Sequence, residues 1–336
     1  MAMTFRKKGV GNGSVSRVLR VIMPIQRRKV NFIAIDKNTL VSYIFLMDIV
    51  PQLVANSVIA GAIYALLTLG FNLIYGTTKF FNLAHGVIAA AGAYAVFALV
   101  KVVNLPINIV VACVIGIVFA GFLGWALDSI VYLPLRTRKA SNMVLMVASL
   151  GAFTAIQAVI AILFTSQFQT LETNAVGSRA YDIAGAVITE TQVIIIACGL
   201  AVVALLGFIA KYTTFGKAVE AIRDDEEVAR MVGIDTNRII GKVFFIGSMI
   251  AGLAGILIGF DTGIEPTMGM NLLLKGTIAA IIGGVGSLYG GFLGAFVLGF
   301  AENFGIWKIS GEWKDAIAFV VLIVFLLVRP QGIIKR

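Results

Sequence analysis

Long apolar runs separated by short polar segments fill most of this 336-residue chain. A helix that crosses a membrane needs about 20 apolar residues. The chain has eight candidate runs, at 52–75, 81–100, 106–132, 143–165, 191–210, 239–260, 276–304 and 315–329. Lipid offers no water to backbone polar groups, so a spanning segment must bond internally. The pattern therefore predicts an all-α integral membrane protein, a bundle of about eight transmembrane helices.

Composition supports this class. The chain is 59% hydrophobic and 13% charged, whereas soluble domains carry about 25% charged residues. Its net charge of +10 fits the excess of Lys and Arg in cytoplasmic loops and does not indicate a nucleic-acid partner. Cys113 and Cys198 lie in apolar runs and are interpreted as packing residues. The single His85 excludes a cluster of histidines around a metal. We predict a multi-pass protein of the cell membrane.

Loop charge predicts the orientation. Segment 135–139 carries three basic residues, so it should be cytoplasmic. Two predicted helices separate it from the basic segment 211–242, which should therefore lie on the same side. The long loop 166–190 between them has one Arg against three acids and should be external. Residue 52 then begins outside.

The glycine-rich run 276–304 is predicted to be re-entrant. The basic C-terminal tail should be cytoplasmic, but full crossings by both 276–304 and 315–329 would place it outside. A turn at 283–287, Gly-Gly-Val-Gly-Ser, would return the run to the side from which it entered, and the tail would then be cytoplasmic. Non-helical backbone at membrane depth is tolerated where it is buried in protein or lines a cavity. The alternative is an ordinary span with a glycine packing face.

Residues 1–46 form a basic N-terminal extension, with nine Lys/Arg and one acid. Its charge favours the cytoplasm, in conflict with the external start of the first helix. Two hypotheses resolve the conflict: a disordered arm, or a misassigned start with translation from Met47. The membrane domain is then 47–336.

Segment 211–242 is a hydrophilic island with six Lys/Arg and six Asp/Glu. It is interpreted as two short helices. Asp224 is predicted to cap the second, with Glu227 three residues later in a capping-box pattern. Gly233 suits the left-handed position after a helix. The island is either a well-capped solvated loop or a docking surface for a soluble partner.

Polar residues inside membrane spans are costly and often functional. Candidates for a translocation path are Asn56, Tyr64, Thr68, Asn72 and Tyr75 in the first helix and Asn82 and His85 at the start of the second. Asn82 has the alternative of an N-cap, and His85 that of a hydrogen-bonded packing residue. The predicted spans are nearly free of Asp and Glu, and no catalytic constellation is present, so an enzyme is not predicted.

Four stretches resemble one family. They are Gly61-Ala62-Ile63-Tyr64-Ala65-Leu66 through Tyr75-Gly76; Phe81-Asn82-Leu83-Ala84-His85-Gly86; Gly216-Lys217-Ala218 through Gly233-Ile234-Asp235; and Gly283-Gly284-Val285-Gly286-Ser287 with Val328-Arg329-Pro330-Gln331-Gly332. Together they resemble inner-membrane permeases of branched-chain amino acid ABC importers, of the LivH type, within a wider family that includes urea and short-amide permeases. The resemblance covers about 47–334.

The resemblance implies that 211–242 is a cytoplasmic coupling loop, whose part 216–235 contacts an ATP-binding subunit. The residues implied are Gly216, Glu220, Ala221, Asp224, Asp225, Glu227 and Gly233. The chain has no Gly-x-x-x-x-Gly-Lys-Ser/Thr phosphate loop, so we expect no cofactor on this chain and ATP on partner subunits.

The implied assembly adds a second related permease, two cytoplasmic ABC ATPase subunits and an extracytoplasmic solute-binding protein. Branched-chain amino acids are the implied substrates, and urea or short amides are the alternative. An ion-coupled secondary transporter, which would be expected to bury ionisable residues, and a channel or membrane scaffold are the other hypotheses.

Overall fold

The computed structural model describes residues 37–103, 107–171, 179–183, 185–307 and 309–334. The chain divides into two compact units, Met1–Leu46 and Met47–Arg336. Both hypotheses about the N-terminal extension concern residues 1–46, and residues 1–36 of these lie outside the described part.

The described chain is almost wholly helical, which confirms the predicted fold class. The helices are α2 (Lys37–Thr78), α3 (Ala84–Phe97), α4 (Ile109–Leu127), α5 (Leu133–Thr137), α6 (Asn142–Phe164), α7 (Glu190–Tyr212), α8 (Thr214–Asp224), α9 (Glu226–Met231), α10 (Thr236–Asp261), α11 (Met268–Gly283), α12 (Leu288–Gly305) and α13 (Lys314–Val328). Two π-helical turns, Ala98–Val102 and Asp128–Tyr132, extend α3 and join α4 to α5, and a 3₁₀ turn, Gly311–Trp313, precedes α13.

Six stretches of the described chain are long and apolar enough to cross a membrane, and they match the first six predicted runs. They are Ile49–Thr78, Ala84–Val102, Ile109–Thr137, Asn142–Phe164, Glu190–Tyr212 and Thr236–Asp261. Helices α11 and α12 form a bent pair, and α13 has 15 residues, fewer than the roughly 20 of a full span. The predicted count of about eight is therefore approximate.

The predicted external loop contains a small β-hairpin that the sequence did not indicate. Strands β1 (Ala180–Ile183) and β2 (Ala186–Thr189) pair antiparallel. Gln52 of α2 binds both backbone groups of one β2 residue, donating to the Val187 oxygen (3.2 Å) and accepting from the Val187 nitrogen (2.8 Å). The β1–β2 hairpin is thus bound to the start of the first spanning stretch.

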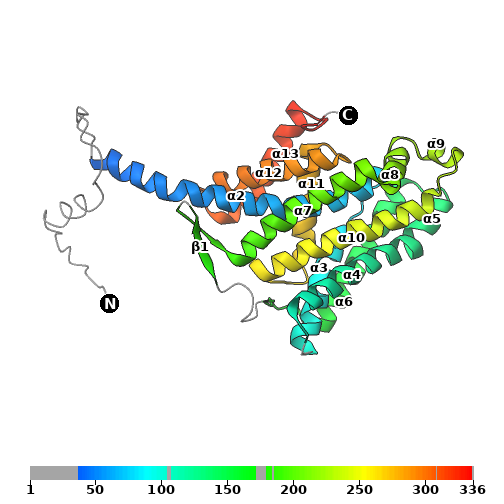
Figure 1. Ribbon diagram of the computed structural model, residues 1–336, viewed down its shortest axis with the longest axis horizontal. Coiled ribbons are helices and arrows are strands. Elements are labelled where there is room, and N and C mark those ends of the chain that lie inside the picture. Colours follow the sequence, from blue (N-terminus) through cyan, green and yellow to red (C-terminus); the bar gives the residue numbers. More distant parts are fainter. Residues whose placement is uncertain (1–36, 104–106, 172–178, 184, 308, 335–336) are drawn as a thin grey trace. The chain divides into compact units, whose positions relative to one another are not determined.

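The bundle has two ends, which we call the α9 end and the β1 end (Figure 1). At the α9 end, Lys79 donates to the Arg223 oxygen (2.6 Å) and Asn142 donates to the Lys79 oxygen (3.3 Å). At the β1 end, Gln192 donates to Asp261 (3.2 Å). Segments 135–139 and 211–242 therefore share one end, and the described residues of 166–190 lie at the other, as loop charge predicted.

Helices α11 and α12, which we call the hairpin pair, meet at residues 284–287 with a bend of 115°. We call these four residues the break; they fall within the predicted turn. Gly284 (φ 108°) and Gly286 (φ 80°) have backbone conformations that favour glycine. Helix α12 then runs back toward the β1 end, where Asn303 donates to the Asn56 oxygen (3.5 Å).

Helix α13 reverses direction once more. After it, the Ile333 nitrogen donates to the Ile282 oxygen (2.9 Å) and the Ile334 nitrogen to the Gly283 oxygen (3.2 Å). The C-terminal segment thus lies against the break, at the same end as the α8–α9 loop. The chain therefore reaches its C-terminal segment on the side of the basic loops, as the charge of the tail predicted.

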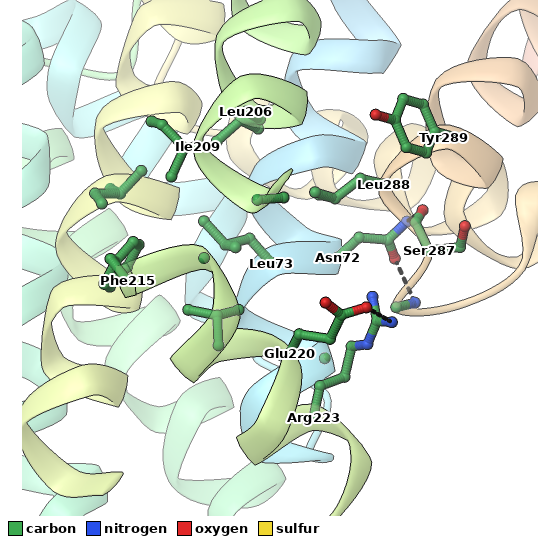
Figure 2. Close-up of a pocket in the computed structure, with 16 residues that line it drawn as sticks. Asn72, Leu73, Leu206, Ile209, Phe215, Glu220, Arg223, Ser287, Leu288 and Tyr289 are labelled. Atoms are coloured by element: carbon green, nitrogen blue, oxygen red, sulfur yellow. Dashed lines mark hydrogen bonds and ion pairs between the residues drawn. The ribbon is translucent and has the colours of Figure 1, made fainter. Parts of the chain in front are cut away.

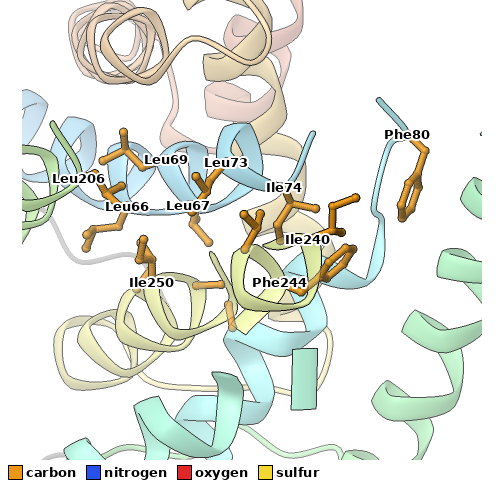
Figure 3. Close-up of a cluster of buried hydrophobic side chains, with 14 of the residues drawn as sticks. Leu66, Leu67, Leu69, Leu73, Ile74, Phe80, Leu206, Ile240, Phe244 and Ile250 are labelled. Atoms are coloured by element: carbon orange, nitrogen blue, oxygen red, sulfur yellow. The ribbon is translucent and has the colours of Figure 1, made fainter. Parts of the chain in front are cut away.

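Helices α2 and α10 form the centre of the bundle. Within the most apolar 18 residues of each stretch, 83% of the α2 residues and 72% of the α10 residues are buried, against 17% in α6 and in α7. Figure 3 shows the contact between them, where Leu66 and Ile74 of α2 lie near Phe244 and Ile250 of α10. The exposed apolar faces of α6 and α7 suit a lipid solvent.

Candidate coupling and gate site

Polar side chains on one face of α2 hold the hairpin pair. Tyr64, Thr68 and Asn72 recur every four residues, so they share this face. Tyr64 donates to Glu302 (2.7 Å), and Thr68 donates to the Gly276 oxygen (2.9 Å) as well as to its own helix. All three side chains are buried. These predicted path residues therefore join two parts of the bundle.

Asn72 binds the break through both atoms of its amide. Its Oδ1 accepts from the Gly286 nitrogen (3.0 Å), and its Nδ2 donates to the Ser287 oxygen (2.9 Å). A chain reversal leaves backbone groups that the helices do not satisfy, and a buried unpaired group costs about 1–3 kcal/mol. Asn72 supplies partners for two such groups, so it binds the backbone of the break to α2.

A cavity of about 310 Å³ adjoins this contact (Figure 2). We call it the α8 pocket. Its lining comes from α2, α7, α8, α10, the break and the start of α12: Asn72, Leu73, Gly76, Leu206, Ile209, Ala210, Phe215, Gly216, Val219, Glu220, Arg223, Ile246, Gly286, Ser287, Leu288 and Tyr289. Elements far apart in the sequence thus share one space at the α9 end.

Helix α8 presents one face to this pocket. Thr213 caps the helix by accepting from the Gly216 nitrogen (3.0 Å). Gly216 is buried so closely against α7 that a side chain there would meet the Ile209 oxygen. Glu220 and Arg223 follow on the same face and line the pocket, while Ala221 packs against the central core. Of the residues predicted for ATPase contact, Gly216 is thus buried against α7, and Glu220 lines the pocket while 62% of its side chain is exposed.

Helix α9 begins one residue later than predicted. Asp225 is its N-cap and accepts from the backbone nitrogens of Glu227 (2.9 Å) and Val228 (3.0 Å). Asp224 instead ends α8, so its assignment as the cap was wrong. The chain folds this way because the Asp225 backbone is extended (φ −153°, ψ 112°), as an N-cap requires. Gly233 has φ 91°, the predicted left-handed conformation.

The remaining path candidates lie outside the α8 pocket. Asn82 Oδ1 accepts from the Ala84 nitrogen (3.1 Å) and from the Tyr132 hydroxyl (3.0 Å). His85 Nε2 lies 3.3 Å from the Leu67 oxygen. Asn56 binds Gln52 toward the β1 end, and Tyr75 stacks on Phe71. Asn82 and His85 are buried at the start of α3, where they join α3 to its neighbours.

One buried charge cluster was not predicted from the sequence. Glu302 of α12 has no exposed surface and pairs with Lys275 of α11 (2.5 Å). Lys275 also pairs with Asp315 (2.8 Å), and Lys314 lies 4.0 Å from Glu302. The expectation that the spans are nearly free of acids overlooked Glu302. Its only sequence signal is an acid two residues before the end of the glycine-rich apolar run 276–304.

Comparisons with known proteins agree with this architecture. A family model described as the permease component of branched-chain amino acid transport systems matches residues 53–326. The high-affinity branched-chain amino acid permease LivH of Escherichia coli K12 is 32% identical over 296 residues, which cover 85% of this chain and 95% of that protein. The chain belongs to the branched-chain amino acid transport permease family. This permease is thus a multi-pass component of the inner membrane and not an enzyme.

Two further relatives extend the comparison. BraD, a high-affinity branched-chain amino acid permease of Pseudomonas aeruginosa, is 29% identical over 295 residues, covering 85% of this permease and 95% of BraD. A solved structure titled PsaBC from Streptococcus pneumoniae in complex with Fab superposes with a TM-score of 0.50 at 13% identity. It covers 87% of this permease and 97% of that chain, which shows a shared fold.

Proposed function

We propose that this permease is the transmembrane subunit of an ATP-driven ABC importer for branched-chain amino acids. It works with a second related permease, two cytoplasmic ATP-binding subunits and an extracytoplasmic solute-binding protein. The names of the relatives support the substrate class. This chain has no phosphate-binding loop of its own, so the partner subunits supply the ATP hydrolysis.

The observation that carries the proposal is the shared lining of the α8 pocket. Helix α8 belongs to the charged loop, and it meets the break that Asn72 holds. Arg223 of α8 lies against α2, where a side chain at Gly76 would meet its Cδ at 3.4 Å. Because α8 packs directly on these elements, a displacement of the loop by a soluble partner moves the walls of the pocket.

Helix α9 offers the surface for that partner. Val228, Met231 and Val232 are 51%, 77% and 71% exposed, and their spacing places them on one side of the helix. Ala229 is buried and anchors the opposite side. Neighbouring acids, Asp224 to Glu227, disfavour an anionic lipid surface as the occupant of this apolar side. A groove in an ATP-binding subunit suits both the apolar residues and their acidic surroundings.

Reconstitution tests the proposal. Proteoliposomes that contain the permease, its partner permease and the ATP-binding subunits should take up labelled leucine when the binding protein is outside and ATP is inside. Uptake should persist when ion gradients are collapsed, and excess isoleucine or valine should compete. Uptake that ends with the ion gradient would support a secondary transporter, and competition by urea or acetamide alone would support the amide substrates.

A substitution on α9 tests the docking surface. Met231→Glu puts a charge where an apolar contact is proposed, so the affinity of the ATP-binding subunits for the permease should fall about tenfold. Co-purification of the subunits with the permease measures this loss. Thr214→Glu adds the same charge at an exposed position at the start of α8 and should leave the complex intact. Equal loss in both variants, or loss in neither, would contradict an apolar docking site on α9.

A further inference from the structure

The α8 pocket has one apolar side of a size that suits a small side chain. Its volume of about 310 Å³ is near the lower end of the range for small-molecule sites, about 300–1,000 Å³. Figure 2 shows Leu73, Leu206, Ile209 and Phe215 around this side. Aliphatic and aromatic carbon therefore surrounds any occupant there.

The opposite side of the pocket carries an acid and a base next to each other. A terminal nitrogen of Arg223 lies 3.7 Å from Glu220, and its Nε lies 3.9 Å from Asp224. Both distances exceed those of charge-assisted hydrogen bonds, about 2.7–2.9 Å. The Arg223 Nε is buried and has no hydrogen-bond partner among the described residues. The guanidinium thus retains donor capacity beside the pocket.

Asn72 and Ser287 add polar atoms to this side, where Figure 2 shows them near the Glu220–Arg223 pair. An α-amino acid carries its ammonium and its carboxylate on one carbon, so a site for it needs an acid and a base side by side. Glu220 suits the ammonium, and Arg223 suits the carboxylate because its fork can bind both oxygens. The apolar side then receives a short aliphatic side chain.

We propose that the α8 pocket is a binding site for a zwitterionic amino acid with a small aliphatic side chain, at the α9 end of the permease. The pocket lies between α8 and the break, so an occupant resists any approach of these elements. Resting on the proposed function, this predicts that product accumulated on the cytoplasmic side slows transport. The α8 pocket is then a feedback site, formed within a single permease chain.

Direct binding tests the site without partner subunits. The full-length permease in nanodiscs should bind labelled leucine saturably, and isoleucine and valine should displace it. Isobutylamine lacks the carboxylate and isovalerate lacks the ammonium, so neither should displace leucine at equal concentration. Absence of saturable binding, or equal displacement by isovalerate, would overturn the proposal, as would a phospholipid acyl chain seen in the pocket.

Three variants locate the binding. Arg223→Gln should weaken leucine binding about 10- to 100-fold, the effect of losing a hydrogen bond to a charged group. Glu220→Gln should weaken it less, by about two- to fivefold, because the Glu220 side chain is 62% exposed. Val219→Phe adds bulk to the lining of the pocket and should abolish binding while both charges remain. Lys217→Gln removes a charge from the same helix outside the lining and should bind as the wild type does. Equal affinity in all four variants would place the site elsewhere.

Transport separates this proposal from the proposed function. Proteoliposomes loaded with leucine should show slower initial uptake with wild-type permease and no slowing with Val219→Phe. Leucine binding in nanodiscs without any ATP-driven uptake would retain the pocket and reject the importer. Uptake with no binding, and with the same slowing in Val219→Phe, would retain the importer and reject the pocket.

Discussion

Two of the contacts that hold the hairpin pair to α2 differ in their chemistry. Near the middle of the first spanning stretch, Tyr64 binds Glu302 inside a cluster that includes Lys275. Two turns further along α2, Asn72 binds the break through two neutral hydrogen bonds to backbone atoms. One helix therefore contacts one structural unit through charged groups in one place and through an amide in the other.

The difference separates a fixed contact from one that can rearrange. Tyr64 donates to a buried carboxylate, and a hydrogen bond to a charged group contributes about 1.5–3 kcal/mol. A neutral hydrogen bond contributes only about 0.5–1.5 kcal/mol net, and the break adjoins a cavity. We infer that the charge cluster holds the hairpin pair in place while the break moves against α2. Three predictions test this division.

The largest expected effect concerns the charge cluster. Glu302→Ala removes the buried partner of Lys275, leaves it only the exposed carboxylate of Asp315, and takes away the acceptor of Tyr64. The free energy of unfolding should fall by about 3–5 kcal/mol, the cost of removing one partner of a buried ion pair. Thermal unfolding of the purified permease in detergent, with circular dichroism as the readout, measures the loss. The double variant Glu302→Ala/Lys275→Met should recover most of it, since no buried ammonium remains. A single variant as stable as the wild type would refute the fixed contact.

The second prediction concerns the break. Asn72→Leu removes both hydrogen bonds and should lower the free energy of unfolding by about 1–3 kcal/mol. Uptake in proteoliposomes should fall by a larger factor than the folded fraction, because the break loses its defined position. Thr77→Val is the control, since the Thr77 hydroxyl bonds within its own helix. Uptake that follows the folded fraction alone would reduce Asn72 to a packing residue.

The smallest expected effect concerns the loop that meets the break. Asp225→Ala removes the cap of α9 and should cost about 1 kcal/mol, seen as faster hydrogen exchange at the α9 amides. Asp224→Ala should change the free energy of opening α9, obtained from the same exchange rates, by no more than a few tenths of a kcal/mol. An exposed ion pair contributes little. The reverse order would restore Asp224 as the cap and contradict the position at which α9 begins.

Much of the fold could be predicted because membrane helices depend on local composition. The apolar runs located the six long stretches, and the glycines at 283–287 located the break. Loop charge placed the two basic segments at one end, which contacts of Lys79 then showed. The β1–β2 hairpin was missed because its strands have only four residues each and lie in a segment without a longer pattern.

The site was less predictable, for a physical reason. The sequence marked Tyr64, Thr68 and Asn72 as costly polar residues within a span, but it could not name their partners. Tyr64 and Glu302 are 238 positions apart, and no local pattern connects them. The prediction of the α9 cap was wrong for a local reason. Asp224 and Asp225 are neighbours with the same side chain, and only the backbone angles show that Asp225 is the N-cap.

By itself, the sequence determined that this chain is a helical membrane protein with a charged loop and a glycine-rich reversal, because hydrophobic length, charge and glycine act locally. Only the tertiary structure decided that Glu220 faces a pocket, that Asn72 holds the break and that Glu302 lies in a charge cluster. Those facts depend on which helix faces meet. Packing of distant segments sets them, and a linear pattern cannot.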